Sequence, residues 1–88
     1  MQLNIGIVED ERHFAEELRA HIGRWQEENY CAVEVQDFGS CRDFLSCRGR
    51  KFDVIFLDIQ LPDGTGVELA KTLRKSQYKG EIVFLTAF

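Results

Sequence analysis

The chain has 88 residues, 44% of them hydrophobic and 30% charged, which is typical of one small globular domain. Its formal net charge of −4 argues against direct binding of this segment to nucleic acid. No apolar run approaches the ~20 residues that cross a bilayer, and no signal segment is present, so we expect a cytoplasmic protein without membrane contact.

The N-terminal part predicts a buried strand followed by a long helix. Leu3–Val8 is a short apolar run that ends at the acidic pair Glu9 and Asp10, as expected of a strand in a sheet core. Apolar residues then recur at helical spacing, which predicts a helix from Asp10 or Glu11 to about Glu28. The residues of its apolar stripe are Phe14, Leu18, Ile22 and Trp25, and we expect Trp25 to anchor the helix at the edge of the core.

The middle of the chain predicts a strand, a short helix and a third strand. Cys31–Phe38 alternates apolar and polar residues, so we expect a half-exposed strand. Ser40, followed by Asp43, predicts the N-cap of a short helix that ends at 49–51. Phe52–Asp58 is apolar on both faces, which predicts a central strand of a covered parallel sheet. The residues of the half-exposed strand that are expected inside are Val33 and Val35.

The last part of the chain predicts a loop, a helix and a fourth strand. Pro62 and two glycines interrupt Leu61–Gly66, which predicts a loop. A helix is expected to begin at Thr65 or Gly66, and a strand is expected to cover Glu81–Ala87. The residues expected on the buried face of this helix are Val67, Leu69, Ala70 and Leu73.

Strands and helices in the order β-α-β-α-β-α-β predict a three-layer α/β fold, with a central parallel sheet and helices on both faces. In such a sheet the carboxyl ends of all strands lie along one rim. Glu9, Asp10, Asp58 and Thr86 lie at three of these ends, so we expect them close together. Three converging carboxylates repel one another, and a hard divalent cation such as Mg²⁺ relieves the repulsion.

These residue types also predict a chemistry. A carboxylate beside Mg²⁺ is placed to act as a nucleophile toward phosphorus, and we expect Asp58 to be that group. A hydroxyl such as that of Thr86 can donate a hydrogen bond to a phosphoryl oxygen. A single acid after a strand is more often a cap or turn residue, and we interpret Asp63 as a turn residue.

At these residues the sequence resembles the receiver domain of two-component response regulators. The matching segments cover the chain from end to end, and their order and spacing are together more specific than any one of them. They are Ile7–Glu11, Phe52–Asp58, the loop pattern Asp58-x-x-Leu61-Pro62-x-x-x-Gly66, and Ile82–Ala87.

The resemblance implies a flavodoxin-like fold and a role for each site residue. Asp58 would be the phospho-acceptor and Asp10 a direct Mg²⁺ ligand, while Glu9 would act on the metal through water. The main-chain carbonyl of Gln60 would be a further ligand, and Thr86 would be the switch hydroxyl. A sensor histidine kinase would supply the phosphoryl group. Further similarity to the LytR/AlgR group implies transcription regulation through a DNA-binding output domain of LytTR type outside this segment.

The family pattern continues with a helix, a fifth strand and a last helix, and its fifth strand ends in a lysine that contacts the phosphoryl group. No lysine of this chain matches that position. We therefore interpret 1–88 as a receiver domain truncated after its fourth strand, without its C-terminal part and any output domain. Truncation would leave 82–88 as an apolar edge strand, so we expect a homodimer, or exchange of elements between copies, through this strand.

Two other functions remain open. An enzyme that uses an aspartyl nucleophile on an external substrate commonly carries a second acid two residues further on, and Gln60 stands there. We therefore expect a self-phosphorylating switch and not an enzyme. The second alternative is a receiver-like interaction module that never carries phosphate, which Glu9 in place of the commoner Asp leaves open.

Overall fold

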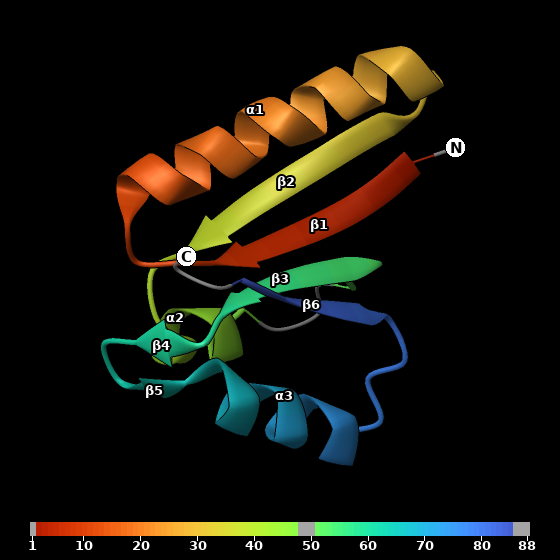
Figure 1. Cartoon of the computed structure of the whole chain (residues 1–88). Helices are drawn as coiled ribbons and strands as arrows, with labels where there is room; N and C mark the ends of the chain where they lie inside the picture. Colours follow the sequence, from red (N-terminus) through yellow and green to blue (C-terminus); the bar gives the residue numbers. More distant parts are fainter. Residues whose placement is uncertain (1, 48–50, 86–88) are drawn as a thin grey trace.

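The computed structural model of the chain describes residues 2–47 and 51–85. Its central sheet has four parallel strands in the order β2-β1-β3-β6 (Figure 1). Helix α1 (Arg12–Asn29) covers one face, and helices α2 (Cys41–Leu45) and α3 (Gly66–Lys75) cover the other. The predicted three-layer α/β fold with a central parallel sheet is therefore confirmed. The strands are β1 (Gln2–Val8), β2 (Ala32–Phe38), β3 (Val54–Asp58) and β6 (Glu81–Leu85).

Parallel pairing brings the carboxyl ends of the strands to one rim of the sheet. Val8 of β1 lies opposite Phe38 of β2 and Leu57 of β3, and Asp58 pairs in register with Leu85 of β6. The arrows of the four strands of this sheet accordingly point the same way in Figure 1. The residues that follow β1 and the residue that ends β3 are therefore neighbours in space, although they are far apart in sequence.

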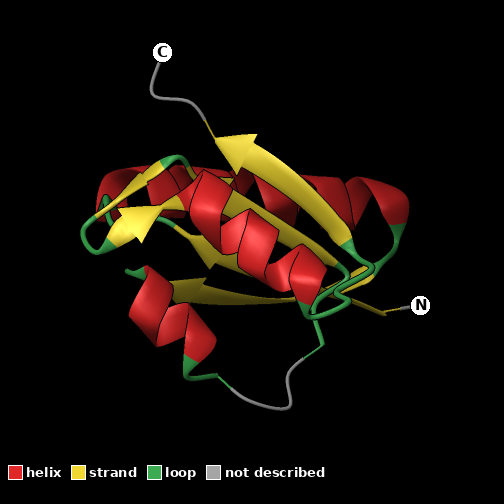
Figure 2. Cartoon of the chain, turned by 90° about the horizontal axis from the view of Figure 1, so that it is seen from below, coloured by secondary structure: helices red, strands yellow, loops and turns green. Residues whose placement is uncertain are grey.

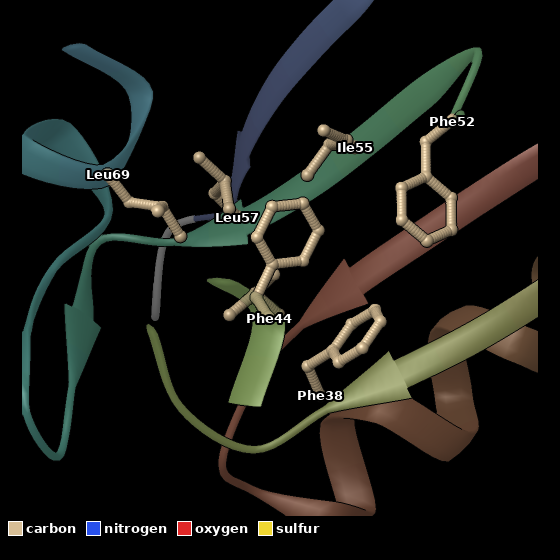
Figure 3. Packing of buried hydrophobic residues seen from close by; sticks show 7 residues of the cluster. Phe38, Phe44, Phe52, Ile55, Leu57 and Leu69 are labelled. Atoms are coloured by element: carbon tan, nitrogen blue, oxygen red, sulfur yellow. The ribbon is translucent and has the colours of Figure 1, made fainter. Parts of the chain in front are cut away.

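One hydrophobic core lies on each face of the sheet, and Figure 2 shows α2 and α3 on the near side with α1 behind. In the α2–α3 core, the rings of Phe38 and Phe44 meet edge to face with their centroids 5.0 Å apart (Figure 3). Full burial of such side chains stabilises the fold by roughly 1.5–3 kcal/mol each. The core under α1 consists of Ile5, Ile7, Ala15 and Ile22. The other consists of Val8, Phe38, Phe44, Phe52, Ile55, Leu57 and Leu69.

Two helices begin where the sequence predicts. The Oγ of Ser40 accepts a hydrogen bond from the N–H of Asp43, and the Oγ1 of Thr65 accepts one from the N–H of Glu68, each at 3.1 Å. First-turn N–H groups have no acceptor inside their own helix, and a side chain that supplies one fixes the helix start. The predicted starts of α2 and α3 are confirmed.

The buried face of α1 differs from the predicted one. Phe14 is 50% exposed and Trp25 is 43% exposed, and Ala15 joins the core instead. Ala15 and Ile22 pack against Ile5 and Ile7 of the sheet, and Arg19 donates to Asp37 at 2.8 Å and to the carbonyl of Val35 at 3.1 Å. Helical geometry then places Phe14 and Trp25 on the flank away from Arg19. The prediction that Phe14 lies on the buried face was wrong, and Trp25, expected to anchor the helix at the edge of the core, is more exposed than buried side chains are.

The loop after β3 and the helix that follows it also differ from expectation. The chain forms a small antiparallel hairpin of β4 (Gln60–Leu61) and β5 (Gly64–Thr65), where the sequence predicted an irregular loop over Leu61–Gly66. Val67 is exposed and not inward, because residues two apart on a helix point about 200° apart and Leu69 faces the sheet.

The ends of two elements differ or lie outside the described part. Helix α2 ends at Leu45, before the predicted 49–51, because the N–H groups of Ser46 and Cys47 close its last turn onto preceding carbonyls. Residues 48–50 and 86–88 lie outside the described residues, so the predicted end of the fourth strand at Ala87 is not described. Among the described helices, none combines the length and the apolar character that a membrane crossing requires.

Candidate functional site

Three carboxylates meet at the rim formed by the ends of β1 and β3. One carboxylate oxygen from each of Glu9, Asp10 and Asp58 lies within 4.8 Å of the other two. In the described part of the chain, this is the one group of three or more acidic, histidine or cysteine side chains close enough to share a metal ion. The structure thus brings together the three acids that the strand order places on one rim.

The turn after β1 holds the acidic pair in two different environments. The N–H of Glu9 donates to the carbonyl of Phe38 at 3.0 Å, which extends the β1–β2 ladder by one residue. The Glu9 side chain is only 6% exposed, and its Oε2 accepts the N–H of Glu11 at 3.0 Å. Asp10 is exposed. Glu9 therefore forms the inner wall of the site, and Asp10 faces the solvent.

Burial and negative charge both act on Glu9. Burial raises the pKa of the Glu9 carboxyl, and the nearby charges of Asp58 and Asp10 raise it further, while the N–H of Glu11 lowers it in part. Among the described residues, no Lys, Arg or His side chain forms an ion pair with these three acids. The Glu9 carboxyl therefore holds a proton more readily than an exposed carboxylate does, and the surplus negative charge of the group suits a cation.

The backbone at Gly66 passes close to the backbone at Asp58, at the point where the loop that carries Gln60 begins and ends. The N–H of Gly66 donates to the carbonyl of Ile59 at 2.8 Å, and a Cβ at Gly66 would overlap the main-chain carbonyl oxygen of Asp58. Any larger residue at Gly66 must therefore displace the end of β3 or the start of α3. Gln60 begins β4 and is exposed, and Thr86 lies outside the described residues.

One contact near the site escaped the sequence analysis. The carboxylate of Asp63, predicted to be only a turn residue, accepts the N–H groups of Cys41 and Arg42, each at 2.9 Å. These two donors pull the pKa of Asp63 below its usual value. The signal that could have found this contact is the first turn of α2, where Ser40 supplies an acceptor for one N–H only.

The donor set fits a hard divalent cation. All three side chains offer oxygen, the inner acid is desolvated, and the exposed side of Asp10 leaves room for water. Mg²⁺ prefers a few carboxylates together with retained waters, whereas a structural zinc site uses sulfur and nitrogen donors. Glu9, Asp10 and Asp58 are therefore the residues that would hold Mg²⁺ in this chain.

Comparison with known proteins places the chain in a family. Residues 5–88 match the family model described as the response regulator receiver domain. The chain belongs to this family. The sensory transduction protein LytT of Bacillus anthracis is 36% identical to this receiver domain over 88 residues, and LytT of Bacillus subtilis is 31% identical over 87 residues. Both alignments cover 98% of this chain and 34% of the relative, so the chain spans about a third of the relatives' length.

Solved receiver domains share the fold. The response regulator TrrA from Thermotoga maritima, in complex with Mg²⁺ and beryllium fluoride, superposes with a TM-score of 0.81 at 29% identity, over 98% of this chain and 70% of that one. The MaeR response regulator bound to beryllium trifluoride gives 0.83 at 23% identity, over 98% and 68%. The predicted flavodoxin-like receiver fold is thereby confirmed.

The raised pKa of Glu9 gives a prediction about stability. A carboxyl whose pKa is raised by folding destabilises the native state once it ionises, so stability falls as pH rises above the unfolded value of about 4.3. Glu9→Gln keeps an acceptor for the Glu11 N–H and removes the charge. We expect the metal-free variant to be more stable than the parent at pH 7, on the order of 1 kcal/mol by urea unfolding.

The control for this prediction is Glu27→Gln, which removes an exposed charge from α1 far from the rim. It should leave stability unchanged within about 0.5 kcal/mol. The advantage of Glu9→Gln should also shrink as the pH falls toward 4, because Glu9 is then protonated in the parent. An equal or lower stability of Glu9→Gln at pH 7 would show that the charge of Glu9 does not destabilise the folded protein.

Proposed function

We propose that this receiver domain accepts a phosphoryl group on Asp58 from a sensor histidine kinase and acts as a self-phosphorylating switch, with Mg²⁺ held by the three rim carboxylates. The observation that supports this most directly is the convergence of Glu9, Asp10 and Asp58 within 4.8 Å without a paired cationic side chain among the described residues. Membership of the receiver family and the TrrA complex with Mg²⁺ and beryllium fluoride support the same proposal.

Each residue has a defined task in this proposal. Asp58 is half-buried at the end of β3, so the sheet fixes its position while the residue stays partly open to solvent, as a nucleophile toward phosphorus requires. Asp10 would bind the metal directly, Glu9 would act on it through water, and the main-chain carbonyl of Gln60 would be a further ligand. Bound Mg²⁺ supplies neutralisation of the charge on the phosphoryl oxygens. Thr86 contributes the hydroxyl that the phosphoryl group attracts.

This chain spans only about a third of the length of its LytT relatives, so the output is a proposal about the whole protein. We propose that phosphorylation of Asp58 controls a cytoplasmic transcription regulator, through a DNA-binding domain of LytTR type outside this segment. The acidic receiver segment itself makes no contact with nucleic acid in this proposal. The names of the relatives, sensory transduction protein LytT, are consistent with a signalling role.

One observation favours a second candidate, a receiver-like interaction module that is never phosphorylated. The Glu9 carboxylate already accepts the N–H of Glu11, so part of its charge is satisfied without a cation. A site that is internally satisfied binds metal more weakly than one that is not. The phosphorylation experiment separates this candidate from the leading proposal.

The test is incubation of the protein in its natural length with Mg²⁺ and acetyl phosphate, followed by mass spectrometry. We expect one added phosphoryl group in the parent and in the control Asp43→Asn, which changes an exposed acid on α2. Asp58→Asn should abolish the addition, because the nucleophilic carboxylate is gone. An unmodified parent would refute the phospho-acceptor proposal and favour the interaction module, and phosphorylated Asp58→Asn would refute the choice of residue.

The open edge of β6 supports an association of two copies. Among residues 2–47 and 51–85, no strand pairs with the outer side of β6, and Val83 and Phe84 are exposed there. The opposite edge strand, β2, carries Glu34 and Asp37, which discourage pairing. We propose that β6 of one copy pairs with β6 of a second in a symmetric dimer.

Sedimentation velocity tests this association. We expect the mass of the 88-residue chain to rise with concentration, and Val83→Lys to shift the equilibrium toward the monomer by placing a charge on the edge. A monomer at every concentration for the parent chain would contradict the proposed dimer.

A further inference from the structure

The carboxylate of Asp63 joins two segments that are distant in sequence. Asp63 lies in the turn between β4 and β5, directly after the phospho-acceptor strand. Its two oxygens accept the N–H groups of Cys41 and Arg42, the first two residues of α2, at 2.9 Å each. Figure 1 shows the β4–β5 hairpin beside α2.

The start of α2 depends on this contact. The first-turn N–H groups of a helix have no acceptor within the helix. Ser40 satisfies the N–H of Asp43, and Asp63 satisfies the two N–H groups before it, so α2 receives part of its cap from the hairpin. The contact is also packed, because a Cβ at Gly64 would lie 3.5 Å from the Sγ of Cys41.

The hairpin in turn depends on Asp63. Strands β4 and β5 have two residues each, and so short a pair is marginal without outside support. The open end of the hairpin is held by a hydrogen bond that the N–H of Gly66 donates to the carbonyl of Ile59 at 2.8 Å. The turn end is held by Asp63. Gln60, paired with Thr65, lies between these two anchors.

We infer that Asp63 is a positioning residue that anchors the β4–β5 hairpin to α2 and thereby holds the main-chain carbonyl of Gln60 beside Asp58. The ordering of the hairpin follows from the described contacts alone, whereas the effect on metal binding rests on the proposed function. Because coupling between two sites is reciprocal, a cation at the rim and the docking of α2 on the hairpin stabilise each other.

The first test is amide hydrogen exchange, which requires no metal. In Asp63→Ala we expect exchange of the hairpin amides and of Gly66 to accelerate about tenfold, because the turn end of the hairpin is released. Asp63→Asn, which keeps one acceptor oxygen, should lie between Ala and the parent. The matched control is Asp43→Ala, which removes an exposed carboxylate from the first turn of α2, the turn that Asp63 caps. It should leave hydrogen exchange in the hairpin unchanged. Unchanged hairpin exchange in Asp63→Ala would overturn the inference.

The second test is the Mg²⁺ affinity of the same variants, measured by titration of amide chemical shifts. We expect Asp63→Ala to bind Mg²⁺ about 3–10-fold more weakly than the parent, within the range seen for residues that support metal ligands. Asp43→Ala should bind like the parent. If the parent binds Mg²⁺ and Asp63→Ala binds equally well, the positioning role is refuted. If the parent binds no Mg²⁺ while the hairpin loosens as expected, the proposed function fails and the anchoring role stands.

Discussion

Three carboxylates have oxygens within 4.8 Å of one another, and one of the three, that of Glu9, is buried. The rest of this rim must accommodate their negative charge. Glu9 and Asp58 arrive there because parallel strands end on the same side of a sheet, and the short turn after β1 adds Asp10. Their mutual repulsion and the burial of Glu9 raise its pKa, so the fold bears a free-energy cost that a bound proton or cation relieves. Under the proposed function, phosphorylation of Asp58 would change the charge of this rim and so alter that cost.

The segments around this rim are linked to it by hydrogen bonds and not only by packing. Asp63 connects the hairpin after β3 to the start of α2, and Gly66 allows the close crossing behind Asp58. A displacement of the hairpin would therefore be felt at α2, whose Phe44 reaches the larger core. The hairpin beside the site, α2 and the core beneath it are therefore joined by one continuous set of contacts.

Much of this arrangement follows from local sequence. The apolar runs predict the strands, Ser40 and Thr65 predict two helix starts, and alternation of strands and helices predicts that the acids converge. The rotation of α1 could not be predicted in this way, because it depends on contacts with strands elsewhere in the chain, both the packing of Ala15 and Ile22 on β1 and the bonds from Arg19 to β2. The role of Asp63 was missed for the same reason: its partners lie about twenty residues before it, so no local pattern reveals them.

The central claim, that the rim binds a divalent cation through its three acids, is tested most directly by paramagnetic Mn²⁺, which shares the oxygen preference of Mg²⁺. Added to the isotope-labelled protein, Mn²⁺ should broaden first the amide signals of Glu9, Asp10 and Asp58. Signals at the opposite end of the sheet, such as those of Asn4 and Asp53, should persist. Excess Mg²⁺ should restore the lost signals. Broadening centred elsewhere on the acidic surface, or none at millimolar Mn²⁺, would contradict the account.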